Sequence, residues 1–131
     1  MSTIFSKIIS GEIPSYKVYE DEHFLAFLDV FPLAKGHTLV IPKKETDYIF
    51  DIDDDELSQM IIVSKKVALA LGKAIPCIKV GVSVIGLEVA HAHIHLIPMQ
   101  AVSDMNFSKP KLQFSKEDMA AIADAIKSNL Q

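Results

Sequence analysis

The run Val89-Ala90-His91-Ala92-His93-Ile94-His95-Leu96-Ile97-Pro98 contains three histidines at alternate positions of a hydrophobic stretch. Alternate side chains of a β-strand point to opposite faces, so a strand would place all three imidazoles on one face and the intervening apolar side chains on the other. An α-helix would align His91 with His95 but turn His93 away. The pattern therefore predicts a strand over residues 91–97 with one face of histidines.

A row of imidazoles is costly as ordinary packing, because each ring has two nitrogens that need hydrogen-bond partners when buried. The alternation thus indicates a functional site, and two kinds fit it. Imidazole is the commonest metal ligand, which favours a metal site. Against that interpretation, the chain has a single cysteine, Cys77, and no His-Glu-x-x-His pattern. The alternative is that one neutral imidazole attacks phosphorus while its neighbours bind phosphate oxygens or a leaving group.

Length and composition limit the class of protein. At 131 residues, 50% hydrophobic and 23% charged, the chain is expected to form a single domain over residues 1–131 and not to be disordered. The net charge of −4 argues against an electrostatic nucleic-acid binder, so local donors must hold any anionic substrate. The lone cysteine and the lack of an apolar run long enough to span a bilayer predict a cytoplasmic protein with no membrane partner.

Hydrophobic periodicity predicts the elements of the fold. We expect a short helix at 3–9, strands at 16–20, 24–28, 37–41, 78–84 and 91–97, a helix from 53 to about 71, and a C-terminal helix at about 115–130. Asp53 and Glu56 are spaced as in a capping box, and Gly72 is expected to end the helix that they begin. The Pro-containing stretch 102–114 is expected to be the most mobile region. Antiparallel strands without regular strand–helix alternation predict the α+β class.

Three blocks of the chain resemble the histidine triad (HIT) family of nucleotidyl hydrolases and transferases, in particular its bacterial nucleoside phosphoramidase-like branch. Residues 91–97 match the signature His-φ-His-φ-His-φ-φ, in which φ is apolar. Residues 4–14 are similar to the family's N-terminal segment, and residues 27–44 are similar to its nucleoside-binding strands. The resemblance implies the HIT-like fold, an antiparallel sheet of about five strands that dimerises into a continuous sheet.

The resemblance also implies a mechanism. His93 would attack the α-phosphorus of a purine nucleoside 5′-monophosphate conjugate and form a nucleotidyl-histidine intermediate that water resolves. His95 would contact the phosphate and assist the leaving group, while His91 and His37 would orient the nucleophile. An alternative for His91 is a structural role, with its ring satisfying a backbone group. Alternatives for the whole protein are a dinucleoside polyphosphate hydrolase and a non-catalytic nucleotide- or metal-binding protein.

Further residues would bind the nucleotide by the same resemblance, and no cofactor is implied. Asp29 would accept the ribose hydroxyls, and backbone amides near the triad would hold the phosphate. The expected base slot and phosphate loop comprise Ile4, Phe5, Ile8, Phe27 and Val30, and Gly86, Glu88 and Val89. The family often has Gly-Gln-x-Val before the triad, whereas Leu87 takes the glutamine position here. Some bacterial members bind zinc through two cysteines that are Thr3 and Ser6 in this chain, so we expect no metal.

A homodimer is implied by the resemblance and has independent support in the sequence. Ile62, Leu69 and Ala70 fall outside the apolar stripe that would face the protein's own sheet. The strand at 78–84 is also too apolar to remain an open edge, because such an edge invites aggregation. A two-fold interface would cover both features with the same surface patch on each subunit.

Overall fold

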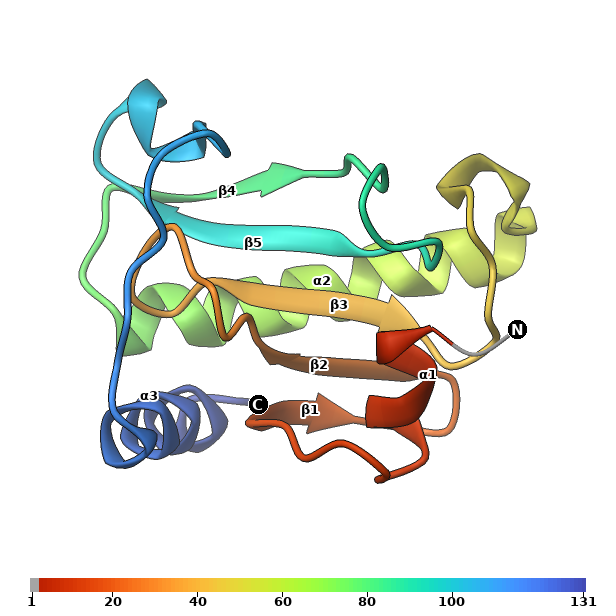
Figure 1. Ribbon diagram of the computed structural model, residues 1–131, viewed down its shortest axis with the longest axis horizontal. Helices are drawn as coiled ribbons and strands as arrows, with labels where there is room; N and C mark the ends of the chain where they lie inside the picture. Colours follow the sequence, from red (N-terminus) through yellow and green to blue (C-terminus); the bar gives the residue numbers. More distant parts are fainter. Residues whose placement is uncertain (1–2) are drawn as a thin grey trace.

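Five antiparallel strands form one sheet in the order β1-β2-β3-β5-β4 (Figure 1). The computed structural model describes residues 3–131. The strands are β1 (Lys17–Glu20), β2 (Phe24–Leu28), β3 (Thr38–Pro42), β4 (Lys79–Ser83) and β5 (Ile94–Met99). The helices are α1 (Ile4–Ile9), α2 (Asp54–Ala74) and α3 (Lys116–Ser128), with 3₁₀ turns η1 (Ile49–Asp51) and η2 (Val102–Met105). The predicted α+β class and five-stranded antiparallel sheet are confirmed.

Side-chain caps fix where the helices begin. The predicted cap of α2 is present, because Asp53 Oδ1 accepts the Glu56 amide at 2.8 Å. The Ser115 hydroxyl accepts the Asp118 amide at 3.0 Å in the same way at the start of α3. These caps satisfy amides that have no partner within the helix.

The prediction that Gly72 ends the second helix is wrong, because α2 continues to Ala74. A glycine in a helix interior costs about 1 kcal/mol relative to alanine but removes no hydrogen bond. Pro76 acts more strongly, since a proline disfavours the helical conformation of the residue before it. Ile75 accordingly has extended backbone angles, with φ −120° and ψ 118°.

The two faces of the sheet bury different clusters. On one face α2 and α3 cover the larger apolar core, to which β5 contributes Ile94 and Leu96. On the other face the short helix α1 packs Phe5 and Ile8 against β2 and β3 (Figure 1). All five residues of β2 are buried, because the strand is covered on both faces.

The predicted strand at 91–97 is displaced, since β5 begins at Ile94 and continues to Met99. His91 and His93 therefore precede the strand. The Ala92 amide donates to the carbonyl of Thr46 at 2.7 Å, which ties this segment to the loop after β3 and not to the β3 ladder. Pro98 is tolerated within β5 because pairing with β3 ends at Leu96.

Strand β4 forms one edge of the sheet and carries exposed apolar side chains. Val82 is 61% exposed, and Ile78 just before the strand is 72% exposed. On α2 the predicted exposure of Ile62 and Leu69 is confirmed, at 66% and 59%. The same prediction for Ala70 is wrong, because this side chain is buried in the core. Within residues 3–131, no helix is both long and apolar enough to cross a membrane.

Candidate active site

A cavity of about 460 Å³ lies on the face of the sheet that carries α1. The sequence-predicted residues that line it are Ile4, Phe5, Ile8, Phe27, Asp29, Val30, His37, Gly86, Glu88, Val89, His93 and His95. They come from α1, β2, the loop between β2 and β3, the segment leading into β5, and β5 itself. His91 is the one predicted site residue that does not line the cavity.

One end of the cavity is an apolar slot formed by α1 and the sheet. The rings of Phe5 and Phe27 meet edge to face with centroids 5.6 Å apart. Phe5 also stands 5.0 Å from the ring of His93, again edge to face. A flat heteroaromatic base suits such a slot, because aromatic edges and apolar side chains pack well against its faces.

Backbone geometry fixes the proton of His93. Its Nδ1 lies 2.7 Å from the carbonyl oxygen of His91. A carbonyl can only accept, so Nδ1 carries a hydrogen, and in the neutral ring Nε2 keeps the lone pair. Nε2 makes no hydrogen bond to any residue in the range 3–131, and it is not sealed from solvent. The arrangement presents an unprotonated ring nitrogen to the cavity.

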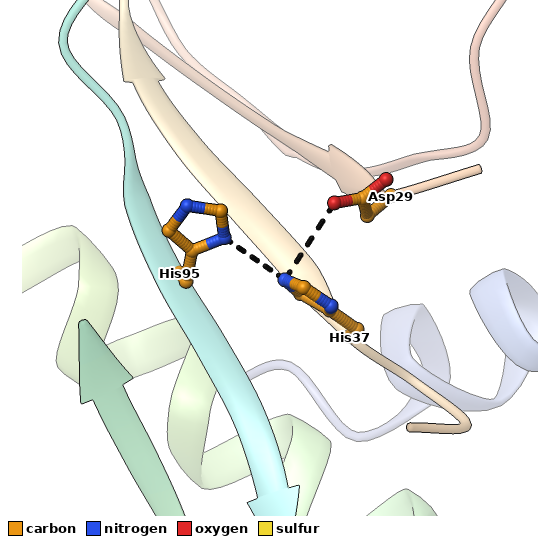
Figure 2. Close-up of side chains that lie close together, drawn as sticks. All are labelled: Asp29, His37 and His95. Atoms are coloured by element: carbon orange, nitrogen blue, oxygen red, sulfur yellow. Dashed lines mark hydrogen bonds and ion pairs between the residues drawn. The ribbon is translucent and has the colours of Figure 1, made fainter. Parts of the chain in front are cut away.

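A chain of hydrogen bonds fixes His37 and His95 in the opposite tautomer (Figure 2). The Leu33 amide donates to His37 Nδ1 at 3.0 Å, so the hydrogen of this ring is on Nε2. Nε2 of His37 lies 2.9 Å from Nδ1 of His95 and must donate to it. The hydrogen of His95 is thereby assigned to its own Nε2. The rings of His93 and His95 are adjacent, with centroids 4.9 Å apart.

Burial keeps the rings of His37 and His95 neutral near pH 7. It lowers the pKa of His37 to about 3, with the neighbouring His95 adding to the effect. Burial likewise lowers the pKa of His95 to about 4, and the nearby His93 acts in the same direction. A neutral His95 donates one hydrogen toward a bound ligand without bringing a full charge.

Asp29 stands beside this chain, at the end of β2 (Figure 2). Its Oδ2 lies 3.6 Å from His37 Nε2, and its Oδ1 accepts the Phe31 amide at 2.8 Å. Burial raises the pKa of this carboxyl, whereas the hydrogen bond from the Phe31 amide and the nearby Lys111 oppose the rise. One carboxylate oxygen therefore remains available to accept hydrogen bonds from a ligand.

The metal interpretation can be tested on these three residues. Ligand atoms of Asp29, His37 and His95 lie within 4.8 Å of one another, which is close enough to share an ion. A metal, however, needs a lone pair on His37 Nε2, and the Leu33 amide already uses the lone pair on Nδ1. Coordination would break that bond and the bond to His95. The geometry favours the hydrogen-bonded chain over a metal site.

His91 anchors the site from behind. It is fully buried, its Nε2 donates to the carbonyl of Pro42 at 2.8 Å, and its Nδ1 lies 3.1 Å from Thr3 Oγ1. The expectation that its imidazole shares a face with the other two is wrong, because the chain turns before β5 begins. Its ring satisfies a backbone group, as the structural alternative held, and its own carbonyl orients His93.

The positions of the family's zinc-binding cysteines do not fit a metal here. Thr3 and Ser6 offer hydroxyls in place of thiolates. The hydroxyl of Thr3 is hydrogen-bonded to Nδ1 of His91. Ser6 Oγ donates to the carboxylate of Glu45. Hydrogen bonds of Thr3 and Ser6 thus link the start of α1 to the loop after β3 and to the triad segment.

Phe107 and Lys111 are among the cavity residues that the sequence analysis did not assign to the site. Both lie in the stretch 102–114 that was expected to be mobile, where no periodic pattern suggested a role. The ring of Phe107 packs edge to face on His95, with centroids 4.8 Å apart. Leu87 also lines the cavity and is 88% exposed. Because leucine has no polar group, it cannot make the hydrogen bonds that a glutamine at this position would make.

Comparisons with known proteins identify relatives of the whole chain. The family model of the HIT domain matches residues 10–102. The chain is 38% identical over 135 residues to an uncharacterised HIT-like protein of Borreliella burgdorferi, and the match covers 97% of each protein. It is 32% identical over 133 residues to the adenosine 5′-monophosphoramidase of Schizosaccharomyces pombe, with complete coverage of both.

A solved structure agrees with the fold over nearly the whole chain. The Hit-like protein of Bartonella henselae superposes with a TM-score of 0.86 at 34% sequence identity. The superposition covers 98% of this chain and 96% of the Bartonella chain. The sheet, the helices and their connections therefore follow the arrangement of that protein.

Proposed function

Because the chain belongs to the HIT family, we propose that it is a hydrolase acting on a purine nucleoside 5′-monophosphate joined through its α-phosphate to a leaving group. The bond cleaved is that of a phosphoramidate, ester or anhydride. The name of the S. pombe relative, an adenosine 5′-monophosphoramidase, favours the phosphoramidate.

One observation carries the proposal, the opposite tautomers of two adjacent histidines. His93 offers a lone pair on Nε2 because its Nδ1 is bound to the His91 carbonyl. His95 offers a hydrogen on Nε2 because its Nδ1 accepts from His37. A nucleophile and an adjacent hydrogen-bond donor, which can stabilise the leaving group or the phosphate, suit cleavage at phosphorus.

The reaction then proceeds in two displacements. Nε2 of His93 attacks the α-phosphorus, a P–N bond forms, and the bond from phosphorus to the leaving group breaks. The leaving group takes a proton from solvent, while the Nε2–H of neutral His95 donates a hydrogen bond to the departing atom. Positive charge that develops on the His93 ring is stabilised by the Nδ1–H···O=C bond to His91. Water next attacks phosphorus and releases a proton to solvent, the P–N bond breaks, and the nucleoside monophosphate leaves.

The remaining cavity residues position the nucleotide. The free oxygen of Asp29 accepts the ribose hydroxyls, and the apolar slot of α1 and β2 grips the base. Gly86 has a positive φ of 72°, and the amides of Gly86, Leu87, Glu88 and Val89 donate to no residue within the described range 3–131. Such unpaired amides suit a phosphate oxygen.

A panel of nucleotide conjugates tests the proposal. Purified protein is incubated with an adenosine 5′-phosphoramidate, a diadenosine polyphosphate and an aryl ester of AMP, and release of AMP is measured. We expect the phosphoramidate to give the highest kcat/KM. Faster cleavage of the diadenosine polyphosphate would support the alternative activity instead. Binding of AMP without turnover of any conjugate would contradict a hydrolase and favour a nucleotide-binding protein.

We further propose that the protein acts as a homodimer in the cytoplasm and forms one domain. The exposed apolar side chains at the β4 edge and on α2 support a two-fold interface there. The interface would join the two sheets edge to edge and cover Ile78 and Val82. Light scattering at micromolar concentration tests it, because a mass near 14.5 kDa at every concentration would exclude the dimer.

A further inference from the structure

The charges that line the cavity do not suit an anionic ligand without help. Asp29 and Glu88 contribute carboxylates, and the buried rings of His37 and His95 are neutral near pH 7. Within residues 3–131, Lys111 is the one lysine or arginine that lines the cavity. The whole chain carries a net charge of −4, so long-range attraction does not compensate. Lys111 is the fixed positive charge available to a phosphate.

Lys111 lies in a segment that crosses the site, residues 106–112, which we name the C-terminal strap. In Figure 1 the strap runs from η2 toward α3 past the end of the sheet. The Leu112 amide donates to the carbonyl of Pro32 at 2.8 Å, which fastens the strap to the loop after β2. Phe107 packs on His95 at the other end of the strap. These contacts hold the strap against the residues of the proposed reaction.

The strap also fixes the lysine head group. Nζ of Lys111 donates to the carbonyl of Phe107 at 2.5 Å and to that of Lys109 at 3.1 Å. An ammonium group has three hydrogens, so one donor is left for a ligand. The two carbonyls orient the ammonium before the ligand arrives, which lowers the entropic cost of using it.

We propose that Lys111 Nζ binds a phosphate oxygen of the nucleotide, as a substrate-binding residue that the triad signature does not include. The proposal rests on the proposed function and deepens it, since it identifies the group that offsets the carboxylates of Asp29 and Glu88. Lys111 lies beyond residues 10–102, the part of the chain that the family model matches. The oxygen belongs to the α-phosphate or to a second phosphate attached to it.

Equilibrium titration with adenosine, AMP and ADP tests this assignment. In Lys111→Met the Kd of AMP should rise about tenfold, the order expected for one charge-assisted hydrogen bond, while the Kd of adenosine changes less than about twofold. Lys111→Arg should stay within about threefold of the original protein for AMP, because it keeps the charge. Lys109→Met is the matched control: it removes a charge from the same strap without touching the cavity, so its AMP affinity should stay within about twofold.

The two nucleotides distinguish the two phosphate positions. Equal weakening of AMP and ADP in Lys111→Met assigns the contact to the α-phosphate, and greater weakening of ADP assigns it to the second phosphate. The proposal is overturned if Lys111→Met weakens adenosine as much as AMP, or if Lys109→Met has the same effect. Failure of the proposed function looks different, because the unmodified protein would then bind AMP but turn over no conjugate.

Discussion

The two faces of the sheet bury side chains of opposite character. The face toward α2 and α3 is closed by apolar side chains such as Met60, Leu96 and Ile126, which are 0–1% exposed. The face toward α1 buries histidines beside a smaller apolar cluster. Ring nitrogens that do not face the cavity are paired with backbone groups, with the Thr3 hydroxyl or with one another, and Figure 2 shows the pair of His37 and His95. Stability is concentrated on one face and chemistry on the other, although both draw on the same strands.

The contrast between the two faces shows how a small protein can bury several imidazole rings and remain stable. Neutral rings cost little when every inward nitrogen has a partner, and backbone groups supply most partners here. The large apolar core on the opposite face supplies the burial that holds those backbone groups in place. Substitutions on the two faces should therefore give different losses, which the following predictions separate.

The largest effect is expected for His93→Ala. Turnover of the best conjugate should fall by on the order of 10³-fold or more, because no other group presents a lone pair to phosphorus. AMP affinity should stay within about tenfold, since it depends on Asp29, the apolar slot and the strap. The matched control is His23→Ala, an exposed histidine outside the cavity, which should keep full activity. More than a tenth of the original kcat in His93→Ala would contradict the nucleophile assignment.

Substitutions in the core on the other face of the sheet, under α2 and α3, should lower the free energy of unfolding. Met60→Ala, in the fully buried part of α2, should lower the free energy of unfolding by about 2–5 kcal/mol, because it leaves a cavity in the core. Its kcat/KM per folded molecule should change less than about threefold. Lys65→Ala on the exposed side of α2 is the control and should lose less than about 0.5 kcal/mol. Urea denaturation followed by circular dichroism measures both. A large loss of kcat with unchanged stability would show that the faces are not separate.

A further loss, specific to the sugar of the nucleotide, is expected at Asp29. Asp29→Ala should weaken ribonucleotide use by about 1.5–3 kcal/mol for each hydrogen bond lost to the carboxylate. Asp29→Asn is the better-matched variant, because its amide oxygen can still accept the Phe31 amide and hold the turn. Kinetics with ribo- and deoxyribonucleotide conjugates check the assignment: the deoxy substrates should lose less. The same loss for both sugars would mean that Asp29 does not contact the ribose.

The smallest effect concerns pH. The pKa values of His37 and His95, about 3 and about 4, lie below the value of about 6.5 in an unfolded chain. As the pH falls from about 6.5 to 5, the unfolded chain binds protons that the native protein does not. The free energy of unfolding should therefore fall, by at most about 1.4 kcal/mol per pH unit for each histidine. Asp29, whose pKa is raised by burial, acts in the opposite direction.

Denaturation with urea at the two pH values measures this dependence. His95→Gln should show a shallower loss than the unmodified protein, because one of the histidines whose pKa burial lowers is gone. A free energy of unfolding that stays constant or rises between about pH 6.5 and 5 would mean that the rings are not held neutral by burial.

The sequence predicted the parts of this molecule that periodicity and local chemistry determine. The order of strands and helices, the cap at Asp53, the start of the C-terminal helix near residue 115, and the exposure of Ile62 follow from residues close together in the chain. The start of β5 could not be found in this way, because it depends on the contact between Ala92 and Thr46 across a long separation. The end of α2 was placed too early because Gly72 and Pro76 both indicate a helix end, and the proline proved to be the stronger of the two.

The site residues also fall into those that local sequence patterns predict and those that depend on long-range contacts. Residues of the triad and the base slot belong to recognisable patterns, and twelve of the thirteen predicted residues line the cavity. Phe107 and Lys111 belong to no pattern, because the strap is held by single contacts such as the one between Leu112 and Pro32. The tautomers of His37 and His93 could not be predicted from the sequence either, because they depend on which backbone groups the fold brings to each ring.

The central claim is that backbone contacts fix a free lone pair on Nε2 of His93. Long-range ¹H–¹⁵N correlation spectra of the ¹⁵N-labelled protein near pH 7.5 test it directly, since protonated and unprotonated ring nitrogens have distinct shifts. We expect the Nδ1–H tautomer for His93 and the Nε2–H tautomer for His37, His91 and His95. A His93 ring protonated on Nε2, or on both nitrogens, would contradict the account.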